Sequence, residues 1–176
     1  GGASIRDVKS IINVGQILNS YANHELVIVF SAMGKVTNML EAVVESYVQK
    51  SADSFAILQQ VKDFHVNILD DLFDKNHIVF DQVDNLFVEV EWILEEEPNQ
   101  SYNYVYDQIV SIGEFLSTKV MSAYLKKIDF EHSFVDARDL IKTDNSYRNA
   151  KVDWKRTLHS VKNKINERHC ITQGFL

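Results

Sequence analysis

The stretch from Leu26 to Leu40, LVIVFSAMGKVTNML, limits the possible folds more than any other part of the sequence. Its first five residues, Leu26 to Phe30, are all apolar and include β-branched side chains, as expected for a buried strand. A small polar loop follows, and from Val36 onward the apolar residues recur at helical spacing. A strand that leads through a short loop into a helix is typical of an α/β domain with a largely parallel sheet.

The loop between this strand and helix is a candidate ligand site. Ligands of open α/β proteins collect at the carboxyl ends of strands, and the loop offers donors at Ser31, Gly34, Lys35 and Thr37. Because a helix N-terminus with such donors favours an anion, we expect a small charged substrate. The alternative is an ordinary β-α turn, in which Thr37 and Asn38 satisfy the local backbone. The loop is not a Walker A loop, because its lysine is not followed by Ser or Thr.

Composition narrows the class of protein. The chain of 176 residues can form one domain with a sizeable core. Its net charge of -7 argues against nucleic-acid binding, which needs a basic surface. No apolar run approaches the ~20 residues that span a membrane, so no membrane partner is expected. The start shows no signal-peptide pattern and the single cysteine excludes an internal disulfide, so the cytoplasm is the expected compartment.

Apolar periodicity predicts an alternation of helices and strands that favours a parallel sheet covered on both faces. We expect helices over 4–22, 36–50, 54–74, 81–96, 102–127 and 154–165, and strands over 26–30, 132–137 and 170–173. Ser4 is the expected N-cap of the first helix, and Gly113 is where the fifth helix would break. The helices within 54–97 form an inserted helical hairpin. Since three strands are few for such a sheet, residues 1–176 are expected to be cut at both ends from a larger domain.

Two further segments could contact a substrate. Gly1 and Gly2 lead into a helix, and glycines let a backbone approach a phosphate, although such a pair is also common in linkers. Glu114 follows Ser111 at the spacing of a capping box, with Ser111 as N-cap. Alternatively, Glu114 is a carboxylate at the mouth of the sheet that holds a substrate amine. One side chain could do both, because a carboxylate has two oxygens.

The other titratable residues give weaker signals. Asp136 and Arg138 follow a predicted strand, where they could form an ion pair or contact a ligand. The six histidines show no metal-binding spacing, and His65 lies on an apolar stripe, which favours a packed side chain. Cys170 begins a predicted buried strand and is expected to be an inert core thiol.

Four segments together resemble motifs of the aspartokinases, which belong to the amino acid kinase family. They are Gly1-Gly2-Ala3-Ser4, Ser31-Ala32-Met33-Gly34-Lys35-Val36-Thr37-Asn38, Gly113-Glu114-Phe115-Leu116-Ser117 and Ile171-Thr172-Gln173-Gly174-Phe175. They are similar to the family's Lys-Phe-Gly-Gly-Thr-Ser opening, its Ser-Ala-Met-Gly-Lys-Thr-Thr-Asn loop, its Gly-Glu-x-Leu-Ser segment and its Val-Thr-Gln-Gly-Phe strand end. Their order and approximate spacing agree along the whole chain.

The resemblance implies a truncated three-layer αβα amino acid kinase (carbamate kinase-like) fold with an inserted helical hairpin. The implied activity is transfer of the ATP γ-phosphoryl group to the side-chain carboxylate of L-aspartate, giving 4-phospho-L-aspartate. This is the first step of lysine, threonine and methionine biosynthesis. The implied cofactors are ATP and the Mg²⁺ bound with it, and the full-length protein is expected to be a homo-oligomer.

The resemblance also implies roles for particular residues. It assigns ATP binding to Gly1, Gly2 and Ser31, and aspartate binding to Thr37, Glu114 and Phe175. Glu114 would pair with the α-amino group of aspartate. Ala3 departs from the family pattern, which has threonine there. The family's lysine is expected before Gly1, so no catalytic residue is assigned within the chain.

Other family parts are also absent from these residues. They are the Arg-Gly-Gly-Ser-Asp segment, the nucleotide-binding lobe and the regulatory ACT domains. The chain therefore corresponds to the aspartate-side lobe and is expected to be inactive alone. The alternatives are a kinase for another small acid, and a non-catalytic homologue or interaction module that uses the hairpin at 54–97 as a docking surface.

Overall fold

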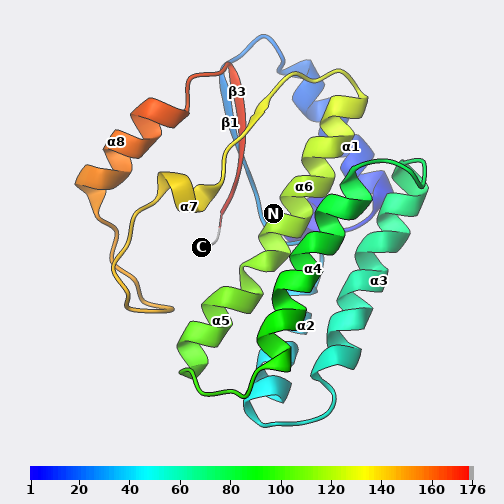
Figure 1. Ribbon diagram of the computed structural model, residues 1–176. Coiled ribbons are helices and arrows are strands. Elements are labelled where there is room, and N and C mark those ends of the chain that lie inside the picture. Colours follow the sequence, from blue (N-terminus) through cyan, green and yellow to red (C-terminus); the bar gives the residue numbers. More distant parts are fainter. Residues whose placement is uncertain (175–176) are drawn as a thin grey trace.

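A small parallel sheet forms the frame of the molecule (Figure 1). The computed structural model describes residues 1–174, and its strands are β1 (Leu26–Phe30), β2 (Ser133–Phe134) and β3 (His169–Gln173). Their order is β1-β3-β2, and both neighbouring pairs are parallel. In this register Ile28 of β1 and Phe134 of β2 both lie opposite Ile171 of β3. Because all three strands run the same way, the loops that follow them leave from one edge of the sheet.

The helices lie close to their predicted positions. They are a short 3-10 helix η1 (Gly2–Ile5), α1 (Val8–Ser20), α2 (Val36–Val48), α3 (Ser54–Leu72), α4 (Val79–Glu95), α5 (Tyr102–Val110), α6 (Ile112–Lys127), α7 (Ala137–Leu140) and α8 (Trp154–Lys164). The predicted helix at 102–127 breaks at Ser111 rather than at Gly113. The predicted strand at 132–137 is shortened to β2, and α7 follows it.

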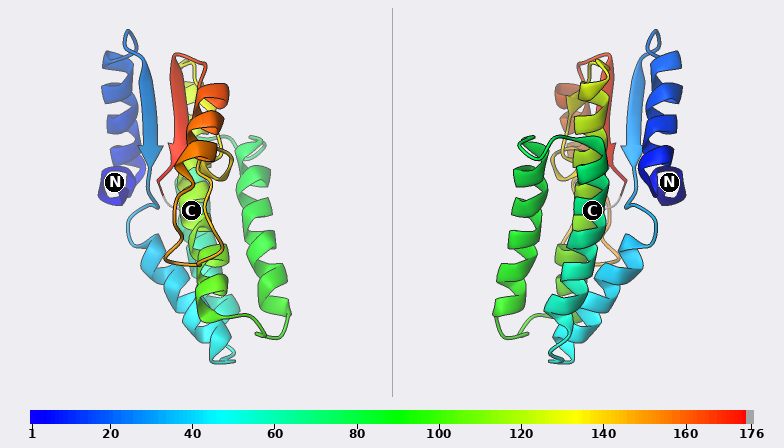
Figure 2. Two further views of the ribbon diagram at one scale, coloured as in Figure 1. Left: turned by 90° about the vertical axis from the view of Figure 1, so that its left-hand side faces the viewer. Right: turned by 90° about the vertical axis from the view of Figure 1, so that its right-hand side faces the viewer.

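Helix α6 is the central element of the core. Its residues 112–118 are all buried, which is typical of a helix enclosed on every side. It contacts β3 and β1 on one face of the sheet, and α4 and α5 on its other side. Helices α3 and α4 form the predicted hairpin and pack beside α2 and α6 (Figures 1 and 2). Among the helices that the structure describes, α6 included, none is long and apolar enough to cross a membrane.

The two faces of the sheet are covered unequally. All five residues of β3 are buried, but β1 alternates between covered and exposed positions. Val27 and Val29 are 56% and 53% exposed. Helix α8 lies on the opposite side of the sheet from α6 (Figure 1). Among the residues described, the second face of the sheet is therefore only partly covered at β1.

The first helix begins later than predicted. Ser4 lies within η1, and no side chain caps that turn. Asp7 instead caps α1, because its carboxylate accepts a hydrogen bond from the Ser10 N–H at 2.8 Å. Hydrogen bonding to Ser10, by its side chain first and by its backbone N–H second, lowers the pKa of Asp7. The prediction of Ser4 as the N-cap is therefore wrong, because α1 begins one turn later and Asp7 caps it.

Candidate functional site

The four motif segments meet at the carboxyl edge of the sheet. The Gly34 N–H donates to the carbonyl oxygen of Gly2 at 3.0 Å, which joins the first segment to the loop after β1. The Gly174 N–H lies 3.2 Å from the carbonyl oxygen of Phe30, which joins the end of β3 to the end of β1. Segments that are far apart in the sequence therefore share one edge, as parallel strands require.

Close packing at this edge depends on glycine. A Cβ atom on Gly2 would lie 2.2 Å from the carbonyl oxygen of Ala32, so only glycine fits there. A Cβ atom on Gly113 would lie 3.1 Å from the Ala32 side chain and 3.2 Å from that of Val36. Gly34 adopts a φ of 50°, which disfavours other residues. The first turns of α2 and α6 consequently lie against each other, with the loop after β1 between them.

Glu114 lies in the first turn of α6 and links that helix to the sheet. Its side chain is buried, and its Oε2 atom accepts a hydrogen bond from the Gly174 N–H at 2.7 Å. The predicted capping box is wrong, because the Ser111 side chain does not cap α6. The Ser111 hydroxyl instead donates to the carbonyl oxygen of Gln108 at 3.5 Å. The Glu114 carboxylate therefore lies at the mouth of the sheet, which was the alternative to the capping box.

The remaining predicted site residues lie around the same edge, and one lies outside the described residues. Ser31 is half-buried at the end of β1. Lys35 precedes α2 and is exposed, as is Thr37 in the first turn of that helix. Gly1 is exposed, and a Cβ atom there would meet nothing within 4 Å. Phe175 is outside the described residues.

The charges at this edge favour a ligand that carries both negative and positive groups. The N-termini of α2 and α6 carry the positive ends of two helix dipoles, and Lys35 adds a cation. Helix N-termini of this kind bind phosphates and carboxylates. Glu114 supplies a carboxylate beside them. The edge can therefore hold a molecule that has anionic groups and one cationic group.

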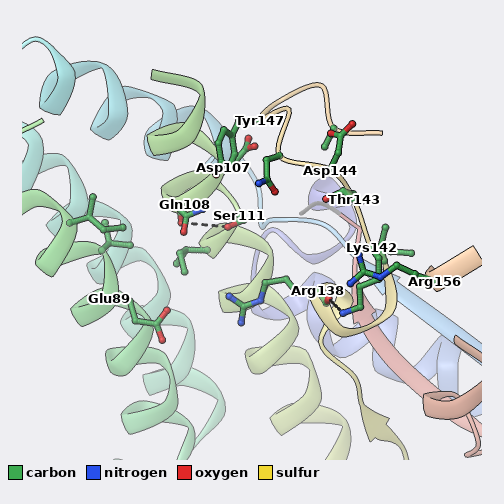
Figure 3. A pocket seen from close by; sticks show the side chains of 16 residues that line it. Glu89, Asp107, Gln108, Ser111, Arg138, Lys142, Thr143, Asp144, Tyr147 and Arg156 are labelled. Carbon is green, nitrogen blue, oxygen red and sulfur yellow. Dashed lines mark hydrogen bonds between the residues drawn. The ribbon is translucent and has the colours of Figure 1, made fainter. Parts of the chain in front are cut away.

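A pocket of ≈ 410 Å³ adjoins the start of α6 (Figure 3). Ser111 and Ile112, which directly precede Gly113 and Glu114, form part of its wall. Side chains of α4, α5, α7, α8 and the loop after α7 form the rest. Its charged lining residues are Glu89, Asp107, Arg138, Lys142, Asp144 and Arg156. Because these come from several separate segments, no motif or periodicity in the sequence indicated the pocket.

Arg138 is a cation of this pocket that contacts both a carboxylate and an aromatic ring. Its guanidinium pairs with the Asp136 carboxylate at 2.7 Å, and this hydrogen bond raises the pKa of Arg138. The guanidinium also lies 4.2 Å from the ring centroid of Phe115, the residue after Glu114. Figure 3 shows the Arg138 side chain extending toward Glu89 across the pocket. The ion pair predicted for Asp136 and Arg138 is thus confirmed, and it lies next to the candidate site.

The other residues considered from the sequence lie in the core. His65 is fully buried, and its Nδ1 lies 2.7 Å from the carbonyl oxygen of Val61. Burial lowers the pKa of His65 to about 4. Cys170 is buried, and burial raises the pKa of its thiol. Within residues 1–174, no group of three or more His, Cys, Asp or Glu side chains could hold a metal ion.

Sequence comparison finds relatives of one kind. The model of the Amino acid kinase family matches residues 1–174. Lysine-sensitive aspartokinase 3 of Escherichia coli (strain K12) is 26% identical over 180 residues, which cover 100% of this chain and 39% of that protein. Aspartokinase 3, chloroplastic, of Arabidopsis thaliana is 27% identical over 158 residues, which cover 86% of this chain and 28% of that protein. The chain thus spans about two fifths or less of the length of these relatives.

Comparison with solved structures also finds aspartokinases. E. coli aspartokinase III in complex with aspartate and ADP (R-state) superimposes with a TM-score of 0.87 at 25% identity, covering 99% of this chain and 39% of that one. The same enzyme in complex with lysine and aspartate (T-state) also gives a TM-score of 0.87, at 24% identity. The predicted three-layer αβα fold is therefore confirmed. Since the family model covers nearly every residue and the fold agrees, the chain belongs to the amino acid kinase family.

Proposed function

We propose that this chain forms the aspartate-side lobe of an aspartate kinase. The enzyme would transfer the γ-phosphoryl group of ATP to the side-chain carboxylate of L-aspartate. The product would be 4-phospho-L-aspartate, the entry to lysine, threonine and methionine biosynthesis. The relatives support this proposal, because they are aspartokinases and one was solved with aspartate and ADP bound.

The position of Glu114 is the observation that carries the proposal. L-aspartate has two carboxylates and a single ammonium group. The edge of the sheet offers one buried carboxylate, Glu114, beside the N-termini of α2 and α6. We infer that Glu114 pairs with the α-amino group, while the helix N-termini and Thr37 face the carboxylates. Phe175 completes the proposed aspartate contacts.

Phosphoryl transfer needs positioning and charge neutralisation more than covalent participation by the protein. In this proposal Gly1, Gly2 and Ser31 face the ATP phosphates, and Mg²⁺ accompanies the nucleotide. The packing of Gly2 against Ala32 supports this assignment, because it holds the backbone of the first segment against the loop after β1. Two anionic reactants could then meet at an edge where backbone donors and helix dipoles offset their mutual repulsion.

The proposal concerns the whole enzyme rather than these residues alone. Since the chain spans 39% of the E. coli relative, we propose that residues 1–176 do not catalyse the reaction by themselves. They would form an incomplete amino acid kinase domain, with the segment 54–97 as an inserted hairpin. The whole enzyme is proposed to be a cytoplasmic homo-oligomer.

The test is calorimetric titration of L-aspartate, with L-glutamate as the control ligand. It compares the chain with two single variants, Glu114→Gln and Glu89→Gln. The amide of Glu114→Gln keeps an oxygen that can accept the Gly174 N–H, so this variant removes the charge and spares the contact with β3. Glu89→Gln removes a carboxylate of equal charge from the adjoining pocket.

We expect aspartate to bind the chain and Glu89→Gln alike, and to bind Glu114→Gln about tenfold or more weakly. A charge-assisted hydrogen bond contributes about 1.5–3 kcal/mol, which sets this scale. Loss of binding in Glu89→Gln alone would indicate that aspartate binds in the adjoining pocket. That result would contradict the role of Glu114. Equal binding of L-glutamate would contradict the proposed substrate.

A further inference from the structure

A second pocket lies at the opposite end of α6 from Glu114. There the last turns of α6 meet the start of α4 (Figure 1). Its volume is ≈ 350 Å³, within the range of pockets that hold small molecules. Because an α-helix rises about 1.5 Å per residue, Lys126 lies about 18 Å along α6 from Glu114. The lining residues of this second pocket are all different from those of the pocket that adjoins the candidate site.

The charge of this pocket is opposite to that of the protein. Three of its lining residues are Lys119, Lys126 and Lys127, and none of its lining residues is acidic. The chain as a whole has 25 acidic and 18 basic residues. Asp81, in the first turn of α4, lines a different pocket between α3 and α4. An anion in this pocket would be attracted by all three lysine side chains.

The three lysines pair with no carboxylate in the part of the chain that the structure describes. The Lys119 Nζ lies 4.3 Å from the ring centroid of Phe134, which holds it at the pocket wall. The Lys127 Nζ donates one hydrogen bond to the carbonyl oxygen of Leu72 at 2.5 Å. The same Nζ lies 5.6 Å from the ring centroid of Phe73, and the ammonium group has two further N–H donors.

The helix dipole explains only part of this cluster. Lys126 and Lys127 lie in the last turn of α6, where cations offset the negative end of the dipole. Lys119 lies in the middle of the helix and has no such role. The helix dipole therefore does not account for a cation at this position.

The start of α4 also lies at this pocket. Ile78, the residue that precedes this helix, lines the pocket. The Nδ1 atom of His77 accepts a hydrogen bond from the Val79 N–H at 3.2 Å. In the neutral ring the proton is therefore on Nε2, which makes His77 a further donor at the lining. The positive end of the α4 dipole reinforces the three lysines.

We propose that this pocket binds the phosphate group of a small phosphorylated molecule. Lysine ammonium groups and a helix N-terminus are the groups that proteins use for phosphates, and the pocket is larger than one phosphate. Ile78, Ala123 and Phe134 supply apolar wall for the rest of such a ligand. The proposal does not depend on aspartate kinase activity, because it involves neither Glu114 nor the edge of the sheet.

The test is calorimetric titration of inorganic pyrophosphate at low ionic strength. The pocket variant combines Lys119→Gln, Lys126→Gln and Lys127→Gln. A charge-matched control combines Lys151→Gln, Lys155→Gln and Lys162→Gln, on the loop before α8 and on α8 itself, where exposed cations also gather. A third protein carries arginine at the three pocket positions and so keeps their charge. It provides a second comparison if glutamine at these positions disturbs folding.

We expect the pocket variant to bind pyrophosphate about tenfold or more weakly, while the control and the arginine protein bind it like the unchanged chain. Amide exchange should slow on binding at residues 79–82 and 119–127. Equal binding by the pocket variant, or loss of binding in the control, would place the anion elsewhere and overturn the proposal. Absence of pyrophosphate binding by the unchanged chain would overturn it as well.

Discussion

Gly1 and Gly2 are neighbours in the sequence but differ in what surrounds them. A Cβ atom on Gly1 would lie in open space, whereas one on Gly2 would meet the Ala32 carbonyl oxygen at 2.2 Å. Backbone is the obstacle at Gly2, so no side-chain rotation can relieve the contact. At the residue scale, the glycine pair that looked like a possible linker contains one position that the fold requires.

We expect Gly2→Ala to lower the free energy of unfolding by about 1–3 kcal/mol, because the added methyl overpacks the loop after β1. Gly1→Ala should change it by less than about 0.5 kcal/mol, as surface substitutions usually do. Urea denaturation followed by circular dichroism measures both. Equal stability of the two variants would show that the first segment does not pack on Ala32 in solution.

At the scale of single elements, the α3–α4 hairpin contains a polar group that its packing does not satisfy. His65 of α3 lies against Phe87 of α4, with ring centroids 6.1 Å apart. Its Nδ1 contacts the Val61 carbonyl oxygen, but its Nε2 is buried and has no hydrogen-bond partner within residues 1–174. Desolvation is the largest cause of its low pKa of about 4. The hairpin therefore holds the imidazole in its neutral form.

This histidine should make stability depend on pH. In the unfolded chain His65 binds a proton with the ordinary pKa of 6.5. In the folded chain its pKa is about 4, so it binds the proton only at lower pH. Stability is therefore full above about pH 6.5 and falls as the pH drops toward 4. At about pH 5 the loss should be about 2 kcal/mol relative to pH 7.5.

His65→Leu should remove this loss of stability on acidification. His159 is an exposed histidine on α8, so His159→Leu should leave the loss unchanged. The measurement is the free energy of unfolding in urea at the two pH values. If the His65 variant loses as much stability on acidification as the unchanged chain, another group is responsible.

At the scale of the whole molecule, the arrangement of layers decides which strand positions carry stability. Ile171 in the central strand is fully buried, whereas Val29 in the edge strand β1 is 53% exposed. The sequence predicted that both Ile171 and Val29 lie in buried strands. A strand's neighbours, rather than its own composition, determine whether its second face is covered.

Ile171→Thr should lower the free energy of unfolding by about 2–4 kcal/mol, because it leaves a cavity and buries a hydroxyl group. Val29→Thr should change it by less than about 0.5 kcal/mol. Thermal and urea denaturation test the pair together. A large cost at Val29 would mean that its outward face is covered in solution.

The sequence by itself determined the order of helices and strands, because periodicity and turn chemistry act over a few residues. It also carried the four motifs, and through them the fold and the family. The short strand β2 and the helix α7 were less predictable, since the tertiary contacts that limit them leave little periodic pattern.

Only the tertiary structure decided where the motifs meet and what their side chains contact. Glu114 and Gly174 are 60 residues apart, yet their hydrogen bond replaced a capping box that local spacing had predicted. The pocket beside Arg138 and the lysine pocket likewise combine several elements. Contacts of this kind depend on how helices and strands pack in space, and a pattern read along the chain contains only their local ingredients.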